Sequence, residues 1–556
     1  MKNYLLLFFI IWCAGCSKKA EPAPPPPAGS FLVSSVKIND LSANRGNNFF
    51  GVNLNPVIKI SFTAPVDQAS VANNLSLVKT SGGATAFTIS YSNSDSTLAI
   101  QPVSALQSLS NYIITITPGV QSNQEVVLST NNTVNLITAI DSTDKFPQIS
   151  DSALLTLVEQ QTFHYFWDFG HPVSGLARER TSSGDIVTTG GSGFGIMAML
   201  VGVQRDFITR AQALARIDTI VSFLSNKVTR YHGAFPHWIN GATGATIPFS
   251  TQDDGGDIVE TAYMMQGLLC ARQFFNSATN QDETNLRAEI NNLYNGVDWN
   301  WYRQNGQNVL YWNWSPDFGW AINVQVSGWD EALITYVLAA SSNVDSSTIP
   351  KMVYDNGWAR NGGMKNGNSY YGIQLPLGPA FGGPLFFAHY SFMGINPHNL
   401  SDTYANYWQQ DTSHAMINYL YCVNNPQHFN GYSNLCWGLT ASDIQNGYTA
   451  SSPTNDVGVI APTAAVSSLP YTPTQSMNAI RFFYYKLGNK IWSKYGFIDA
   501  FNLSSLWFDS DCLAIDQGPE IVMIENYRSG LLWNLFMSCP EVKRGMTDLG
   551  FQGPDL

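Results

Sequence analysis

The sequence has little charge. Only 12% of its 556 residues are Asp, Glu, Lys or Arg, whereas soluble domains usually have about 25%. The charge that is present is mainly negative, with a formal net charge of −12 at pH 7. Nucleic acids and anionic membrane surfaces are bound through Lys and Arg, so this composition excludes both as partners. We expect a neutral, hydroxyl-rich ligand instead.

Motifs of several enzyme classes are missing. The cysteines have no C-x-x-C spacing, and His232 and His237 are five residues apart with no third ligand nearby, which disfavours zinc. There is no EF-hand pattern, although calcium held by Asp and loop carbonyls stays open. No G-x-S-x-G elbow is present, and the glycine-rich segment 189–195 lacks the Lys of a phosphate-binding loop. We therefore predict no cofactor and no metal, and interpret 189–195 as a close backbone approach at the floor of a groove.

Five cysteines lie beyond the N-terminal segment, an odd number in apolar surroundings. We expect buried thiols, with at most one disulfide. They are Cys270, Cys422, Cys436, Cys512 and Cys539.

The N-terminus has an apolar run, residues 4–12, that follows Lys2 and precedes Ala14-Gly15-Cys16. It is too short for a membrane span and is typical of an export signal. Its end resembles the bacterial lipobox, which implies a signal peptide of residues 1–16 and lipid attachment at Cys16. The expected location is then the cell envelope of a Gram-negative bacterium, as an outer-membrane lipoprotein on the periplasmic or outer face, with ordinary secretion as the alternative. The Pro-rich residues 17–30 would be a tether.

Two regions of different character follow. Residues 31–142 contain no Trp or Cys and show short alternating runs, which predict a small antiparallel β-sandwich. This region resembles bacterial Ig-like modules, and we interpret it as a spacer rather than a carbohydrate-binding module. Residues 151–556 contain every Trp except Trp12 and repeat helical periodicity with long loops between. They predict a mainly α toroid whose loops form a groove at one end.

Acidic residues gather in segment 251–275. A helix beginning near Gly255 would place Asp257 and Glu260 on one face, with Asp253 and Asp254 at its cap. The alternative is that the three Asp residues only cap the helix. Glu331 is expected to open another helix, 331–340. Carboxylates surrounded by aromatic rings suit hydrolysis of a glycosidic bond.

Inverting hydrolysis needs an acid and a base roughly 6.5–9.5 Å apart. Side chains on adjacent turns of one helix are only about 5–6 Å apart at Cβ, so we expect Glu331 to face Asp257 and Glu260 across the groove. Crowding should raise the pKa of at least one carboxyl and keep its proton available. Which acid takes which role stays open.

Aromatic and hydrogen-bonding side chains in the loops are candidates for sugar binding. For each one, core packing or a structural hydrogen bond is the alternative. The candidates are Arg178, Arg180, His232, His237, Trp238, Asp253, Trp312, Trp314, His389, Tyr390, Tyr471 and Gln517.

Ten loop motifs, among them TGGSGFGIMAM, DDGGDIVETA, WGLTASD, YGFIDAFN and AIDQGPEIVMIENYRSGLLW, resemble the glycoamylase-like family of bacterial secreted proteins, and most closely glycoside hydrolase family 144. The resemblance covers residues 151–556 and implies an (α/α)6 toroid. It also implies internal cleavage of linear β-1,2-glucan with inversion, giving sophorose and short oligosaccharides, by a monomer. By the same resemblance, Asp257, Glu260 and Glu331 align with the acids that the family uses.

Four other functions remain to be separated by experiment. They are a transglycosylase or phosphorylase on similar glycans, an exo-acting hydrolase, a glucoamylase-type hydrolase on α-glucan, and a surface glycan-binding protein without catalysis. Linkage preference depends on the shape of the groove, which residue types alone do not give.

Overall fold

A computed structural model describes residues 29–556. The predicted signal peptide, Cys16 and nearly all of the predicted tether lie outside the described residues. The chain divides into two compact units. The first is formed mainly by residues 55–105 and 112–136, and the second by 137–556 with the short segments 44–54 and 106–111. None of the helices within residues 29–556 combines the length and the apolar character needed to cross a membrane.

The β-sandwich contains two four-stranded sheets, with strand orders β1-β3-β6-β5 and β2-β8-β7-β4. Alternate residues are buried along β3 and β7, as expected when one face of a sheet packs against the core. The predicted sandwich is therefore present. Its elements are β1 Val33–Ile38, β2 Asn48–Val52, β3 Ile58–Phe62, α1 Gln68–Val71, β4 Leu75–Lys79, β5 Phe87–Ser92, β6 Thr97–Pro102, β7 Asn111–Ile116 and β8 Asn132–Thr138.

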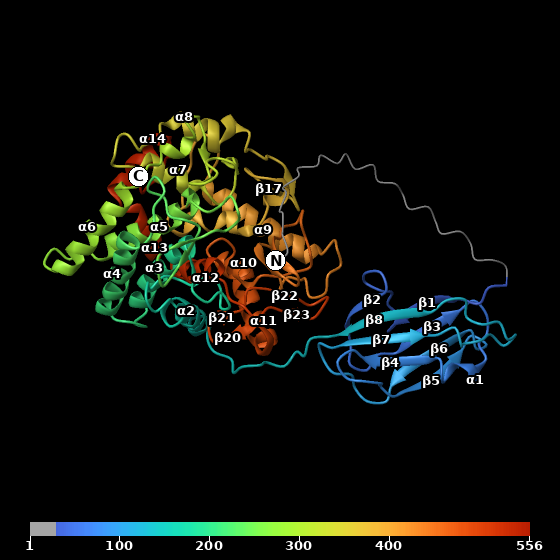
Figure 1. The fold of residues 1–556 in the computed structure, drawn as a ribbon. Helices are drawn as coiled ribbons and strands as arrows, with labels where there is room; N and C mark the ends of the chain where they lie inside the picture. The colour runs from blue at the N-terminus through green and yellow to red at the C-terminus, as the bar shows by residue number, and fades with distance from the viewer. Residues whose placement is uncertain (1–28) are drawn as a thin grey trace. The chain divides into compact units, whose positions relative to one another are not determined.

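The second unit is mainly helical (Figure 1). Its α-helices are α2 Asp151–Trp167, α3 Thr189–Gln204, α4 Arg210–Asn226, α5 Ile258–Phe274, α6 Gln281–Asn295, α7 Leu333–Ala340, α8 Lys351–Val353, α9 Tyr407–Asn424, α10 Pro462–Ser467, α11 Pro473–Ile491, α12 Ala514–Ser529, α13 Leu531–Met537 and α14 Pro540–Leu549. Two short 3-10 helices, Leu385–Ala388 and Ser391–Met393, lie between α8 and α9.

The loops of this unit contain short strands. The ones that matter for the site are the sheet β11-β10-β9 and the pair β12-β14. The strands are β9 Ile186–Thr188, β10 Trp238–Asn240, β11 Thr246–Ile247, β12 Gly256–Asp257, β13 Leu310–Tyr311, β14 Asn313–Trp314, β15 Gln325–Val326, β16 Ser369–Tyr370, β17 Ile373–Gln374, β18 Ala441–Ile444, β19 Gly447–Ala450, β20 Trp492–Ser493, β21 Gly496–Phe497, β22 Phe501–Asn502 and β23 Trp507–Phe508.

Helices in the middle of this unit are buried all round. Nearly every residue of α3 and α5 is buried, and α3 packs against α5 and α12 while α5 also packs against α7. A helix that is apolar on every side must be enclosed by others. By contrast α4 and α6, at the edge of the unit in Figure 1, each keep an exposed polar face. The helices therefore form an inner and an outer set, with the core between them.

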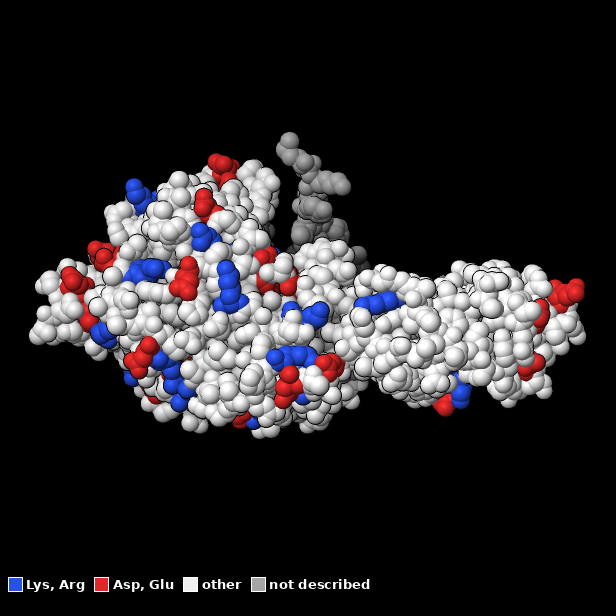
Figure 2. Space-filling view, turned by 90° about the horizontal axis from the view of Figure 1, so that it is seen from below, with Lys and Arg blue, Asp and Glu red and all other residues white. Residues whose placement is uncertain are grey.

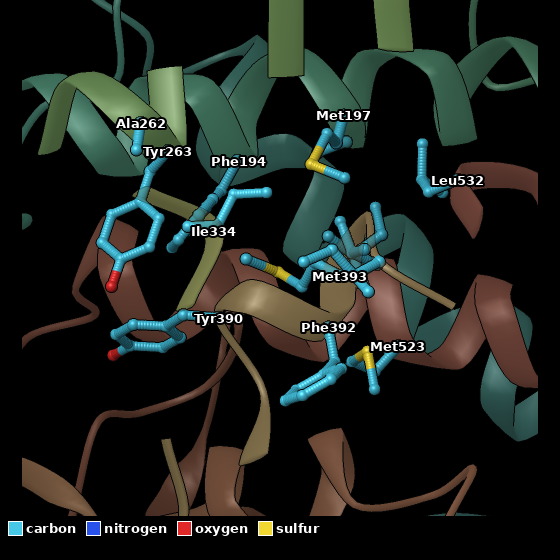
Figure 3. Packing of buried hydrophobic residues seen from close by; sticks show 14 of the residues in the cluster. Phe194, Met197, Ala262, Tyr263, Ile334, Tyr390, Phe392, Met393, Met523 and Leu532 are labelled. Carbon is cyan, nitrogen blue, oxygen red and sulfur yellow. The ribbon is translucent and has the colours of Figure 1, made fainter. Parts of the chain in front are cut away.

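The core joins residues far apart in the sequence. In Figure 3, Phe194 and Met197 of α3, Tyr263 of α5, Ile334 of α7 and Met523 of α12 converge on one cluster. The rings of Tyr263 and Tyr390 lie 5.7 Å apart, edge to face, and their hydroxyls point to the same side of this cluster. Apolar burial of this extent is the main stabilising term for the unit.

Glycines allow α3 and α5 to cross at very short distance. A Cβ added at Gly193 would lie 2.2 Å from the carbonyl oxygen of Tyr263, and one at Gly267 would lie 2.1 Å from that of Gly193. No side chain fits such gaps. The close backbone approach predicted for the glycine-rich segment is confirmed.

Two helix boundaries differ from the sequence prediction. α5 begins at Ile258 rather than near Gly255, because 256–257 pair with β14 as a strand. α7 begins at Leu333, so Glu331 lies in the preceding turn rather than in the helix. The five cysteines are free, buried thiols, as expected.

Charged side chains are sparse on the surface. The face shown in Figure 2 is mostly uncharged, and many of its acidic groups lie next to a basic one. This agrees with the low charge content of the sequence.

Candidate active site

Asp257 holds the start of α5. Its Oδ1 accepts the backbone N–H groups of Val259 (3.0 Å) and Glu260 (2.9 Å), which makes it the N-cap. Its Oδ2 lies 2.9 Å from Nδ1 of His237, and the residue is fully buried. Asp257 is thus both a helix cap and a partner of His237, so the two interpretations made from the sequence both apply to it.

Glu260 lies one turn further along α5 and points at the start of α3. Its Oε2 accepts the backbone N–H of Gly190 at 2.6 Å and is 3.4 Å from the hydroxyl of Thr188. A Cβ at Gly190 would be 2.7 Å from the same oxygen, so only glycine allows this contact. Glu260 is 7% exposed, which leaves a small part of it accessible to a ligand.

His237 is the only basic side chain in the set formed by His237, Asp253, Asp257 and Glu260, and its charge affects the pKa values of Asp253 and Glu260. Burial tends to lower the pKa of His237, but the charge of Glu260 and the hydrogen bond to Asp257 outweigh it and raise the pKa to about 9. Burial and the charge of Asp257 raise the pKa of Asp253 to about 7. Burial also raises the pKa of Glu260, against the opposing charge of His237. At neutral pH the group therefore contains an imidazolium among carboxyls that retain protons readily.

Asp253 and Asp254 do not cap the helix, contrary to the prediction that placed them there. Asp253 is 9% exposed, and its carboxyl lies close to His237 and to the carboxyl of Asp257. Asp254 lies in the loop before β12, with a buried carboxylate oxygen that has no hydrogen-bond partner within the described residues. The later helix start explains the difference, since the cap position falls to Asp257.

Glu331 approaches from a different part of the chain. Its backbone carbonyl accepts the hydroxyls of Ser391 and, at 3.4 Å, Tyr263. Burial and the charge of Asp330 raise the pKa of its carboxyl well above the usual range, and the charges of Glu260 and Asp257 add to this. Glu331 is thus connected to α5 through Tyr263, and its carboxyl interacts with the charges of Asp257 and Glu260, although the acids come from two segments about 70 residues apart.

An aromatic surface borders these acids. The exposed ring of Phe249 lies 4.2 Å from that of His237 and 4.8 Å from that of Trp238, and Phe249 is 51% exposed. Aromatic faces of this kind stack on the apolar faces of sugar rings. Trp238 and His237 were expected here from the sequence; Phe249 was missed, because a single Phe in a polar loop gives no signal by itself.

A second aromatic group includes two other predicted residues, His232 and Trp314. His232 stacks on Trp301 at 3.7 Å and meets Trp314 edge-on at 4.8 Å. Trp314 lies on β14, which pairs with the strand that carries Asp257. Trp312 packs partly buried against the core. Trp314 and its neighbours are thus held next to the acids through backbone pairing.

The two arginines have structural partners. Arg178 donates to the carbonyls of Gly184 and Phe169 and lies over the ring of Phe169. Arg180 pairs with Glu179 and Asp443. Arg178 therefore binds backbone carbonyls within the protein, whereas Arg180 forms an ion pair with Asp443, a member of the second acidic cluster described below.

Three of the predicted sugar contacts lie in the core. The imidazole of His389 is hydrogen-bonded to Ser468, and burial lowers its pKa to about 3. The hydroxyl of Tyr471 donates to the carbonyl of Ala388, and the amide of Gln517 donates to that of Phe497. All three are buried and have these internal partners, which fits the alternative of core packing and structural hydrogen bonds.

Tyr390 is also buried, yet it is not an ordinary core residue. Its hydroxyl has no hydrogen-bond partner within the described residues. Burial raises its pKa well above the usual value, and the charges of Asp516 and Glu331 both contribute. The charges that act on Tyr390 therefore include that of Glu331 and that of Asp516, which belongs to a second set of acids.

That second set was missed by the sequence analysis. It comprises Asp443 of β18, Asp499, Asp509 and Asp516 of α12. Three of these lie in the motifs WGLTASD, YGFIDAFN and AIDQGPE. In a chain with so few charges, an acid within each of three separate loop motifs was a usable signal, but sequence spacing alone could not show that they meet.

Comparisons with known proteins agree with this architecture. Residues 323–540 match the family described as "Putative glucoamylase", and residues 41–138 match the bacterial Ig-like domain. A crystal structure from Bacteroides uniformis, described as a putative glucoamylase, is 54% identical over 74% of this chain and all of its own, with a TM-score of 0.72. The chain belongs to the glycoamylase-like family. The predicted family, the helical toroid fold class and the N-terminal Ig-like domain are confirmed.

Two other relatives of this glycoamylase-like protein carry more specific descriptions. The endo-β-1,2-glucanase of Chitinophaga pinensis, solved with sophorotriose and glucose, is 50% identical over 74% of this chain and all of its own, with a TM-score of 0.71. An exo-β-1,2-glucooligosaccharide sophorohydrolase of Parabacteroides distasonis is 45% identical over 420 residues, which are 72% of this chain. The match spans only 58% of the length of that relative.

Proposed function

We propose that this protein is a glycoside hydrolase that cleaves linear β-1,2-glucan internally, with inversion, to sophorose and short oligosaccharides. The observation that carries the proposal is that Glu331, connected to α5 through Tyr263, interacts with the charges of Asp257 and Glu260, while the exposed ring of Phe249 lies against His237, the partner of Asp257. The β-1,2 linkage is supported by the two relatives whose descriptions name β-1,2-glucan or its oligosaccharides. Internal cleavage is favoured because the identity to the Chitinophaga endo-glucanase is 50%, against 45% to the exo-acting relative.

Glu331 is the group we assign as proton donor. Its pKa is raised by burial and by Asp330, so its carboxyl keeps a proton at neutral pH and can give it to the glycosidic oxygen as the bond breaks. Glu260 is assigned as the base that takes a proton from the attacking water on the other face of the sugar. The imidazolium of His237 supports its ionised form.

Asp257 is assigned a positioning role. Both of its carboxylate oxygens are already occupied by the α5 backbone and by His237, so it has little capacity left for water or substrate. It orients His237 and fixes the start of the helix that carries Glu260.

Incubation with a panel of linear glucans tests the proposal. We expect rapid loss of β-1,2-glucan, with products of mixed length early and sophorose accumulating later, and no action on β-1,3-, β-1,4- or α-1,4-glucan. NMR of the first products should show inverted anomers. Disaccharide as the only early product would indicate an exo-acting enzyme, and cleavage of α-1,4-glucan would indicate a glucoamylase-type hydrolase.

The remaining alternatives are separated by additions to the same assay. A phosphorylase would need inorganic phosphate, and a transglycosylase would make longer products when an acceptor sugar is added. A glycan-binding protein would retain oligosaccharide and release no reducing ends. A binder would have little reason to keep several desolvated carboxyls beside its ligand.

The place of action that we propose is the cell envelope, with lipid at Cys16 as the membrane contact. The motif Ala14-Gly15-Cys16 supports it. Wild type should partition into the detergent phase after expression in a Gram-negative host, and Cys16→Ser should not. Equal partition of both into the aqueous phase would favour ordinary secretion.

A further inference from the structure

Four aspartates from separate segments meet in the second acidic cluster. One carboxylate oxygen each of Asp443, Asp499 and Asp509 lies within 4.8 Å of the others. The carboxyl of Asp516, from the first turn of α12, interacts electrostatically with that of Asp499. Asp499 and Asp516 are each 2% exposed and Asp443 is 8% exposed. Strand β18, the loop before β22, the residue after β23 and the first turn of α12 are thus held around one point.

The positive charge in contact with this cluster does not balance it. Arg180 contacts both oxygens of Asp443 at 3.0 and 2.7 Å, and it also contacts both oxygens of Glu179. One guanidinium is therefore divided between two acids. Three further carboxyls of the cluster need a counter-charge, because unpaired buried carboxylates are strongly unfavourable.

Several oxygens of the cluster have no partner. Within the described part of the chain, Oδ1 of Asp499, Oδ2 of Asp509 and Oδ2 of Asp516 are buried and form no hydrogen bond with a donor. In contrast, Oδ2 of Asp499 accepts the backbone N–H of Asp443 at 2.7 Å, which fixes the orientation of that carboxylate and directs its other oxygen to the cluster. Buried carboxylate oxygens of this kind usually bind a donor or a cation.

We propose that this cluster binds a calcium ion. Ca²⁺ takes six to eight oxygen ligands at about 2.3–2.6 Å, so two oxygens on opposite sides of one ion are about 5 Å apart. The 4.8 Å limit on the spacing of the three carboxylate oxygens fits that geometry. Asp443, Asp499 and Asp509 provide the protein ligands, Asp516 supports Asp499 from α12, and water completes the coordination.

At this position the ion would link two short hairpins. Asp443 lies on the β18–β19 hairpin, and Asp509 follows β23, whose strand pairs with β22. These short hairpins have few backbone hydrogen bonds of their own. A cation shared between them stabilises these two hairpins and holds them next to each other.

Calcium binding is measured on the full mature chain without any glycan. Protein treated with EDTA and dialysed is melted with and without about 5 mM CaCl2, a concentration that saturates sites of the affinity found in extracellular modules. We expect Tm to rise by about 2 °C or more, since a ligand that binds only the native state stabilises it. Isothermal titration should show about one ion per chain.

Asp509→Asn is the main variant, because Asp509 is only partly buried and its removal leaves the Asp443–Asp499 contact in place. It should remove the calcium-dependent rise in Tm, as should Asp499→Asn, whereas Asp345→Asn in an exposed loop should keep it. The proposal is overturned if wild type shows no rise, if Asp509→Asn keeps it, or if MgCl2 gives an equal rise. In the first case, protons shared between carboxyls neutralise the cluster instead.

Discussion

At the scale of single residues, the partners of each acid decide what it can do. Asp257 is occupied by two backbone amides and an imidazole, while Glu260 has one strong backbone contact. The carboxyl of Glu331 has acids as its main electrostatic neighbours. Chemically similar side chains therefore differ in proton affinity and accessibility, which is what an acid and a base in one site require.

Replacement of Glu331 by Gln tests the assignment of the proton donor. We expect kcat on β-1,2-glucan to fall by about 10²–10⁴-fold, the usual contribution of a general acid, with Tm close to that of wild type. Asp317→Asn, in an exposed loop, is the control and should keep wild-type rates. If Glu331→Gln and Glu260→Gln both retain wild-type kcat, the cluster is not catalytic. If kcat falls in Glu331→Gln but not in Glu260→Gln, the general base is another acid, such as one of the second cluster.

Phe249→Ala tests the aromatic surface. The ring is exposed, lies tilted against His237 and meets Trp238 edge-on, so its loss should remove sugar contact without disturbing the acids. We expect KM to rise about 10-fold, equivalent to about 1.4 kcal/mol, with kcat nearly unchanged. Val173→Ala, also at an exposed apolar position, should leave both constants unchanged. A fall in kcat with constant KM would show that Phe249 acts on the acids instead.

At the scale of elements, the crossing of α3 and α5 sets the position of the site. Gly190 donates to Glu260 because the two helices start side by side, and they do so because Gly193 and Gly267 let their backbones touch. The glycines of α3 were visible in the sequence as a close approach. Their partner could not be identified, since any buried helix could have filled that role.

Gly267→Ala should force the two helices apart. A methyl group there would lie 2.1 Å from the backbone of Gly193, and rigid backbone cannot yield as a side chain can. We expect a loss of about 1–3 kcal/mol or more in the free energy of unfolding. Urea denaturation would measure it, with Thr219→Ala on the exposed face of α4 expected within about 0.5 kcal/mol of wild type. Wild-type stability in Gly267→Ala would contradict the close crossing.

At the scale of the whole molecule, buried ionisable groups link stability to pH. The folded-state pKa of His237 is about 9, against 6.5 for an ordinary histidine, so the folded state binds the proton more tightly than the unfolded state. The resulting stabilisation is fully present below pH 6.5 and is lost as pH rises through 9. The pKa of the Asp253 carboxyl, raised to about 7, likewise makes the folded state less stable as pH rises, but over a lower pH range.

We therefore expect Tm to fall between pH 6.5 and 9.5, and to fall less steeply in His237→Gln. His164→Gln is the matched control, since His164 also contacts an aspartate but lies in an exposed pair. Thermal melts at several pH values would measure the slopes. An identical slope in wild type and His237→Gln would mean that other groups dominate the dependence.

The sequence by itself determined the classes of structure. Strand alternation in residues 31–142 and helical periodicity beyond Asp151 are local properties of the chain, so they could be interpreted without knowing any distant contact. The same holds for the Asp257–Glu260 spacing and for the burial of five thiols. The resemblance to family motifs added the (α/α)6 form of the toroid and the alignment of Asp257, Glu260 and Glu331 with the family's acids.

Only the tertiary structure decided which side chains meet. His389, Tyr471 and Gln517 occur in loop motifs like those of the site residues, yet packing places them in the core. Asp443, Asp499 and Asp516 are spread over more than 70 residues, and they converge because β18, β22 and the start of α12 are folded against one another. Contacts between distant segments depend on the path of the whole chain, and no local pattern of residues encodes that path.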